Sequence, residues 1–214
     1  MTLRRWNRRF ALGMALLGLA CGGDGGGTQP PGPPADLVKS GGDGQSWYFN
    51  NPLPTALSVT AVDVDGRAVP GVVITWAVAS GGGSVTPTQS TTNANGVATT
   101  TDSIGGSTIQ MVNATFTGLA GPVSFTEQAT TPPTAAVVNV GDNFFDKASV
   151  VVQVNSAVTW TWTGQVGHSV TFTGGPDSGV QPSGTFQRTF TSTGVFNYFC
   201  KVHGGMTGSV TVVH

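Results

Sequence analysis

Short runs in which apolar and polar side chains alternate recur along the chain, and this period of two constrains the fold more than any other feature. Ile74, Trp76 and Val78 share one face of such a run, and neighbouring side chains point to opposite faces in an extended strand. Asp65-Gly66, a turn-forming pair, follows an earlier run. The 32 glycines and the charged fraction of 9% also favour strands and turns over helices. We therefore expect an all-β chain.

Two segments rich in proline divide the chain. Residues 22–34 combine glycine with proline and predict a flexible linker. Residues 131–134 contain two consecutive prolines, which interrupt the strand pattern and predict a hinge. The segments 35–130 and 135–214 each have the length of a small domain. We expect two tandem β-sandwiches, the first with Trp76 in its core.

The first 21 residues have the organisation of an export signal. An arginine-rich start is followed by an apolar run from Phe10 to Ala20 and by small residues before Cys21. This run is too short to span a bilayer as a helix. Its end resembles the bacterial lipoprotein signal, although Gly18 stands where a large aliphatic residue is usual, and ordinary signal cleavage stays open. We expect export to the periplasm or cell surface, with lipidated Cys21 as a membrane anchor.

Without that segment the chain is acidic. Five basic residues then face ten acidic ones, which gives a net charge of about −5. No basic face remains for nucleic acid, so we expect no nucleic-acid partner.

Cys200, His203 and Met206 stand at the even spacing C-x2-H-x2-M, in a chain with only two cysteines and three histidines. If Cys21 is lipidated, Cys200 has no partner for an internal disulfide. Thiolate, imidazole and thioether form a soft ligand set. Two histidines and a cysteine with a weak axial methionine are typical of blue-copper electron-transfer sites.

Such a site needs a second histidine, and the remaining candidates are His168 and His214. His168 stands at the start of a predicted strand, where a loop at one end of a sandwich can meet another loop. His214 is the last residue and follows a strand that runs away from the 200–206 loop. The spacing therefore favours His168.

Other uses of these residues stay open at this point. A zinc site could use His168, Cys200 and His203, although methionine is a poor zinc ligand. A cysteine–histidine hydrolase would need an oxyanion hole that the sequence does not indicate. Plain packing of cysteine and methionine in a core is the remaining interpretation.

The first segment resembles a known class of domains. The phrases "LSVTAVDVDGRAVPGVVITWAVASGGGSV" and "TTNANGVATTT" are similar to the bacterial immunoglobulin-like domains of invasin- and adhesin-type surface proteins, over roughly residues 52–129. The resemblance implies a spacer or adhesive module without chemistry of its own.

The second segment resembles the plastocyanin-type and amicyanin-type cupredoxins over residues 135–213. The resemblance rests on "VGHSVTF" and on "FNYFCKVHGGMTGSVTVV". It implies a small Greek-key sandwich in which His168, Cys200, His203 and Met206 bind one type 1 copper per chain. Ser169 follows the first ligand where the family often has asparagine. Its backbone N–H can still donate to the Cys200 sulfur, but we expect a weaker side-chain brace between the loops.

Together these features predict an electron-transfer protein with redox partner proteins, and not an enzyme, because four protein ligands leave no evident open position on the metal. His203, beside Gly204 and Gly205, is the expected electron exit. Two alternatives stay open: an extracytoplasmic copper-binding or delivery protein, and a surface structural or adhesive protein. In the main interpretation the first sandwich lifts the copper domain away from the membrane.

Overall fold

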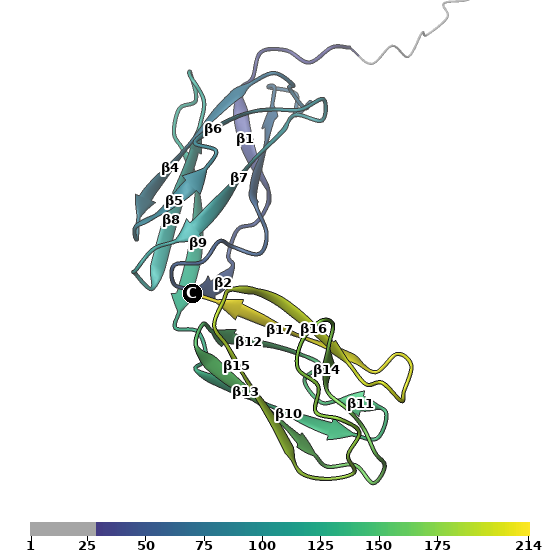
Figure 1. The fold of residues 1–214 in the computed structure, drawn as a ribbon. Coiled ribbons are helices and arrows are strands. Elements are labelled where there is room, and N and C mark those ends of the chain that lie inside the picture. The colour runs from purple at the N-terminus through teal and green to yellow at the C-terminus, as the bar shows by residue number, and fades with distance from the viewer. Residues whose placement is uncertain (1–28) are drawn as a thin grey trace, which may run out of the picture. The chain divides into compact units, whose positions relative to one another are not determined.

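The computed structural model describes residues 29–214 of the chain. The predicted export signal, Cys21 and residues 22–28 of the predicted linker lie outside the described residues. All regular elements within this range are β-strands, numbered β1 to β17 (Figure 1). Among the described residues there is no helix long and apolar enough to cross a membrane. The all-β prediction is confirmed.

The strands between residues 36 and 130 form two sheets. The first sheet has the order β1 (Asp36–Gly41), β3 (Leu57–Val62), β7 (Val97–Ile104) and β5 (Gly83–Thr86). The second has the order β2 (Ser46–Tyr48), β9 (Val123–Thr130), β8 (Ile109–Thr115), β4 (Val73–Ser80) and β6 (Gln89–Thr91).

Trp76 lies in the core between these sheets, as the alternation predicts. It is buried and packs against Phe125, and its indole Nε1–H donates a hydrogen bond of 2.8 Å to Ser90 Oγ. Gly66 has positive φ, which is the conformation that the predicted Asp65-Gly66 turn requires. The immunoglobulin-like character of this sandwich and the boundaries predicted at 35, 130 and 131–134 stay predictions.

The strands between residues 135 and 213 form two further sheets. One has the order β11 (Phe144–Phe145), β10 (Ala135–Gly141), β13 (Ser156–Trp162) and β15 (Thr185–Phe190). The other has the order β12 (Ser149–Gln153), β17 (Thr207–Val213), β16 (Gly194–Phe199) and β14 (Thr171–Phe172).

The second sandwich therefore has eight strands. Two of them, β11 and β14, have two residues each, which is too short for an alternating pattern to be visible. The pairs β10–β13 and β12–β17 are parallel, whereas the other pairs of these sheets are antiparallel. Parallel neighbours cannot be joined by a tight hairpin, so the chain must cross between the two sheets.

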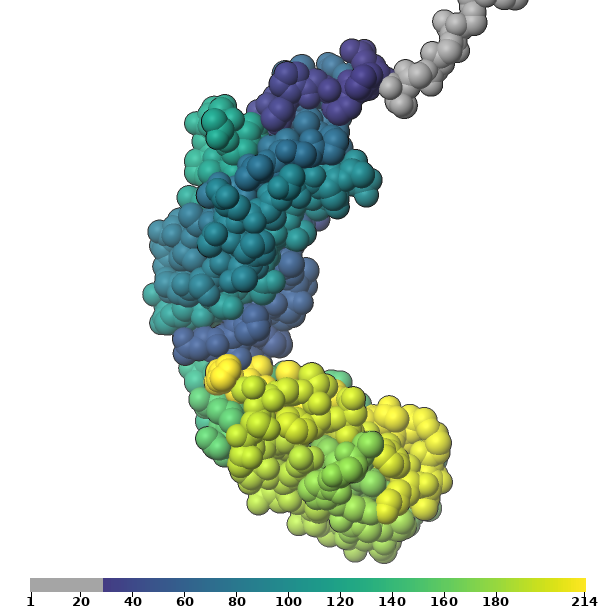
Figure 2. Space-filling model, turned by 45° about the horizontal axis from the view of Figure 1, so that its top comes forward, coloured from purple at the N-terminus to yellow at the C-terminus, as the bar shows by residue number. Residues whose placement is uncertain are grey.

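Trp160 lies at the centre of this second sandwich, fully buried. Its ring contacts Phe172 and Tyr198 edge-on, with centroids 5.7 and 5.2 Å apart. Aromatic contacts of this kind add to the stabilisation that area burial provides. In Figure 2 the residues of this sandwich, coloured green to yellow, present a closely packed surface.

The register of the short strand β14 brings two loops together. Thr171 pairs with Phe199, so the start of β14 lies opposite the end of β16. Residues just before Thr171 must therefore lie beside residues just after Phe199. His168 belongs to the first of these segments and Cys200 to the second.

Candidate metal centre

Cys200 follows directly on β16, and its side chain turns into the sandwich. Only 4% of the residue is exposed. Its backbone N–H donates to the carbonyl of Met206 at 3.0 Å, and Met206 N–H donates to the carbonyl of His203 at 3.3 Å. These two bonds close the 200–206 loop into a tight turn between β16 and β17.

His168 comes from the loop between β13 and β14 and is fully buried. Backbone hydrogen bonds in both directions with Gln181, each 3.0 Å, hold its main chain. The buried Trp162 Nε1–H donates to the His168 carbonyl at 3.1 Å. These bonds hold the main chain that carries the imidazole. The Nδ1 atom of the ring lies 3.8 Å from the Cys200 sulfur.

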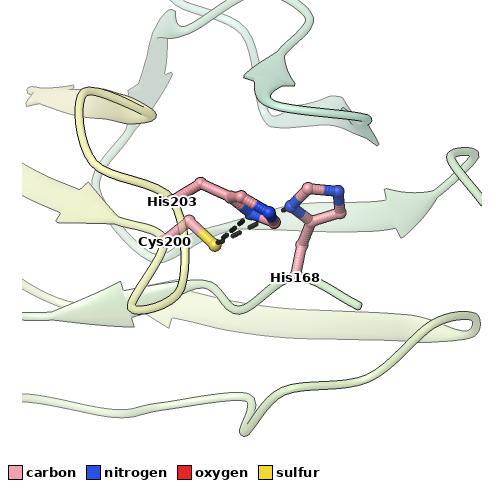
Figure 3. Close-up of side chains that lie close together, drawn as sticks. All are labelled: His168, Cys200 and His203. Carbon is pink, nitrogen blue, oxygen red and sulfur yellow. Dashed lines mark hydrogen bonds between the residues drawn. The ribbon is translucent and has the colours of Figure 1, made fainter. Parts of the chain in front are cut away.

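His203, on the 200–206 loop, brings a second imidazole to the same sulfur. Its Nδ1 lies 3.6 Å from Cys200 Sγ, and the centroids of the two imidazole rings lie 4.5 Å apart. Figure 3 shows both rings on the same side of the sulfur, with dashed lines from the sulfur to each ring. His203 is only partly buried, and both Gly204 and Gly205 are exposed.

Met206 completes the loop. It is 3% exposed and belongs to the hydrophobic core of the second sandwich. The hydrogen bond from Cys200 N–H to its carbonyl places its backbone beside Cys200. The thioether is therefore buried at the end of the sandwich where the two histidines and the cysteine meet.

Ser169 joins the two loops through both its backbone and its side chain. Its N–H donates to Cys200 Sγ at 3.5 Å, as the sequence analysis expects. Its hydroxyl oxygen accepts the N–H of Lys201 at 2.9 Å. The hydroxyl also bonds Thr171 Oγ1 at 3.0 Å, which in turn donates to Asp177 Oδ1 at 3.0 Å. The sequence predicts a weaker side-chain connection between the loops here, but the Ser169 hydroxyl does bond the opposite loop.

The distances fit a single metal ion. The Cys200 sulfur and a nitrogen of each histidine all lie within 4.8 Å of one another. With metal–sulfur bonds of about 2.3 Å and metal–nitrogen bonds of about 2.0 Å, donors at a trigonal angle lie about 3.7 Å apart. The observed separations of 3.6 and 3.8 Å agree with that value.

The chemistry of the donors favours copper over zinc. Both Nδ1 atoms face a buried thiolate-forming sulfur, and a buried methionine lies on the same loop. Structural zinc sites prefer a fourth cysteine, histidine or carboxylate, and methionine suits copper better. The group of His168, Cys200, His203 and Met206 is compatible with one type 1 copper.

His214 follows β17 and is exposed, outside this cluster. The candidate group therefore contains His168 and not His214.

Two carboxylates lie near the centre and are held ionised by their surroundings. The backbone N–H groups of Val166 and Gln165, followed by the contact with His168, lower the pKa of Asp142. The hydrogen bond from the Lys201 ammonium is the first of the contacts that lower the pKa of Asp177. The negative charge of Asp177 is paired, whereas Asp142 faces a candidate ligand.

Comparison with known proteins agrees with this geometry. Amicyanin-alpha of Methylorubrum extorquens is 30% identical over 107 residues, which span 47% of this chain and 88% of the relative. The chain belongs to the amicyanin-type cupredoxins. Halocyanin of Natronomonas pharaonis is 38% identical over 87 residues, 36% of this chain and 53% of halocyanin. No family model matches the chain.

Solved cupredoxin structures also align with the chain. An amicyanin variant in its reduced state is 27% identical with a TM-score of 0.33, over 37% of this chain and 82% of that one. A purple cupredoxin from Nitrosopumilus maritimus is 23% identical with a TM-score of 0.32, over 36% of this chain and 99% of that one.

Sequence reasoning missed two contributors to the cupredoxin centre. Asp142 reaches His168 across 26 residues, and the Thr171–Asp177 pair supports Ser169. No sequence spacing marks either of them, because an aspartate in a turn and a threonine in a strand are common in β-proteins. Only the pairing of the strands shows that these residues lie near the ligands.

Proposed function

We propose that the chain is a type 1 (blue) copper electron-transfer protein that binds one copper through His168, Cys200, His203 and Met206. The observation that carries the proposal is the triangle of donors formed by the buried Cys200 sulfur and the two histidines, whose Nδ1 atoms lie 3.8 and 3.6 Å from the sulfur and which all lie within 4.8 Å of one another. Copper, when bound, supplies a one-electron couple between Cu(II) and Cu(I). The protein's share is to hold the donors in nearly one arrangement for both oxidation states.

The surroundings of the donors support this role. His168 is fixed through its main chain, and Ser169 ties the two loops together. When the donor atoms do not have to move as copper changes its oxidation state, the reorganisation energy of electron transfer is low. The Ser169 N–H bond to the sulfur also offsets negative charge on the thiolate, and hydrogen bonds to the sulfur tune a copper thiolate.

The first test adds Cu(II) to the chain lacking residues 1–21 and records the visible spectrum. We expect an intense blue band that a mild reductant bleaches reversibly and that Cys200→Ser abolishes, since the sulfur is the donor that gives the band. A colourless protein that prefers zinc would instead support copper handling or a structural role.

His203 is the proposed electron exit. It is the more exposed of the two histidines, and the apolar Val202 beside it is 51% exposed. Gly204 has no atom within 4 Å of the position that a Cβ would occupy. A bulky side chain there fits the fold and covers the approach to His203.

Gly204→Leu should therefore slow electron exchange with a redox partner by roughly tenfold without changing the blue band. This factor corresponds to about 1.4 kcal/mol in the activation free energy. Gly121→Leu is the control for bulk, because Gly121 also has open space and no positive φ but lies between β8 and β9 of the first sandwich. Equal rates in stopped-flow measurements on Gly204→Leu and the unchanged chain would contradict an exit at His203.

We further propose export and a membrane anchor at Cys21, with the first sandwich as the spacer that lifts the copper domain. Support comes from the arginine-rich start, the apolar run and the linker of residues 22–34 in the sequence. Mass spectrometry of the mature chain checks lipidation at Cys21. Solution scattering that shows the two sandwiches folded back on each other would contradict the spacer role.

A further inference from the structure

The imidazole of His168 has two nitrogens, and the structure gives each a different neighbour. Nδ1 faces the Cys200 sulfur at 3.8 Å. Nε2 lies 3.5 Å from Oδ1 of Asp142, in the turn between β10 and β11. An ionised carboxylate can only accept hydrogen bonds. In a neutral imidazole, a hydrogen bond to this carboxylate requires the proton on Nε2, which leaves the lone pair of Nδ1 directed at the sulfur and free to bind a metal.

The position of Asp142 is built by several contacts. Its Oδ1 also accepts the backbone N–H groups of Gln165 at 2.8 Å and Val166 at 3.1 Å. A Cβ at Gly164 would overlap this oxygen, so only glycine allows the approach. The Val140 carbonyl adds hydrogen bonds from the N–H groups of Thr163 and Gly164 at 2.9 and 3.2 Å. The turn thus fastens the loop that carries His168.

The charge of Asp142 is not cancelled by a basic side chain. Among the ion pairs of the described residues, its only partner is His168. The side chain is 42% exposed, whereas that of His168 is fully buried. Solvent reaches the carboxylate from one side, and its other side faces the candidate ligand.

We propose that Asp142 is a positioning residue for the copper centre: it holds His168 in the tautomer that presents Nδ1 to the metal, and its charge shifts the balance between Cu(II) and Cu(I) toward Cu(II). Outer carboxylates orient ligating histidines and raise their basicity. A more basic ligand and a nearby negative charge both stabilise the more highly charged ion. The effect on copper rests on the proposed function, whereas the tautomer can be read without metal.

The first experiment uses the full chain without metal. Long-range proton–nitrogen NMR on the histidine rings reports which nitrogen is protonated. We expect only the Nε2–H tautomer at His168, and a mixture with the Nδ1–H tautomer in Asp142→Ala. An unchanged tautomer in Asp142→Ala would overturn the positioning role, whether or not the chain binds copper.

The second experiment measures the reduction potential of the copper-loaded chain by spectroelectrochemical titration. Asp142→Asn keeps an oxygen that accepts the same hydrogen bonds but removes the charge. We expect the ratio of Cu(I) to Cu(II) at a given potential to rise by roughly tenfold, a shift of about 59 mV for one electron. This measurement also stands if Asp142→Ala does not fold.

Asp146→Asn is the matched control. Asp146 lies in the same hairpin region and bonds Asn139 Nδ2 at 3.1 Å, with no contact to His168. Its removal changes the net charge equally, so we expect a clearly smaller shift in potential. Equal shifts in the two variants would overturn a specific effect of Asp142. A chain that gives no blue band contradicts the proposed function and leaves the tautomer measurement to decide the positioning role.

Discussion

At the scale of single residues, the centre depends on groups that connect the two loops and not only on the candidate ligands. The Ser169 hydroxyl shows this, because it is buried and accepts the N–H of Lys201 across 32 positions of the chain. Without this hydroxyl, the Lys201 N–H and the Thr171 hydroxyl would each lose a hydrogen-bond partner, which costs free energy. The serine is thus a structural brace next to the sulfur.

Ser169→Ala should lower the free energy of unfolding of the second sandwich by about 1–2 kcal/mol. The backbone N–H that faces Cys200 Sγ stays in place, so the blue band should persist. Urea unfolding measures the loss. Ser149→Ala is the control, because the Ser149 hydroxyl bonds only Ser209 in an exposed setting. Equal destabilisation of the two variants would mean that the bond between the loops contributes nothing.

The candidate ligands were predictable from the sequence, whereas the residues that orient them were not. Cysteine, histidine and methionine are rare here, so a cluster within seven residues carries information. Asp142 is one of ten acidic residues, and its contact with His168 depends on a turn 26 residues upstream. Such a contact arises from tertiary pairing, which local spacing does not contain.

At the scale of elements, the alternation predicted the strands and their buried faces well. In β13, the buried residues Val158, Trp160 and Trp162 recur with period two. The pattern was least informative for β11 and β14, which have two residues each. The alternation also could not predict the order of strands in each sheet. It shows which face of a strand is buried but not which strand lies beside it.

Alternation also misses polar residues on a buried face. Glu127 on β9 and Asp102 on β7 point inward with the apolar side chains and are 0% and 1% exposed. Glu127 Oε2 accepts the N–H of Gln45 at 2.6 Å, while Glu127 Oε1 and Asp102 Oδ2 have no hydrogen-bond partner. Desolvation raises the pKa of Glu127 to about 7 and that of Asp102 to about 6.

The first sandwich should therefore lose stability as the pH rises. The folded state holds these protons more tightly than the unfolded chain does, so the favourable contribution is complete below about pH 4 and lost by about pH 7. For Glu127 we expect a loss of about 3 kcal/mol, since each pKa unit corresponds to about 1.4 kcal/mol. Urea unfolding between pH 4 and 8 measures it.

Glu127→Gln should flatten this dependence, because the amide can still accept the Gln45 N–H but cannot ionise. Asp65→Asn, an exposed carboxylate of the same sandwich, should leave the slope unchanged. If the stability of Glu127→Gln still falls steeply with rising pH, groups other than Glu127 cause the pH dependence.

At the scale of the whole molecule, the metal site belongs to one sandwich only. All candidate donors lie between residues 168 and 206, in loops of the sandwich that strands β10 to β17 form. A ligand that binds only the folded state stabilises the unit that holds it. Copper should therefore act on the second sandwich and not on the first.

Calorimetry of the chain should show one thermal transition that copper raises and one that copper leaves in place. At a free copper concentration a hundred times Kd the added stability is about 2.7 kcal/mol. This corresponds to a rise of roughly 10 °C or more for a domain of this size. Cys200→Ser should lose the rise. A single transition that moves as a whole would contradict the predicted hinge at 131–134.

The hydrogen bond from Trp162 Nε1–H to the His168 carbonyl has a consequence for optical work on this protein. It ties a buried indole to the main chain of the residue whose ring faces the sulfur. Any change in electron density or position at the imidazole therefore occurs close to a natural fluorophore. The emission of Trp162 becomes an internal reporter of site occupancy, and no dye or label has to be attached.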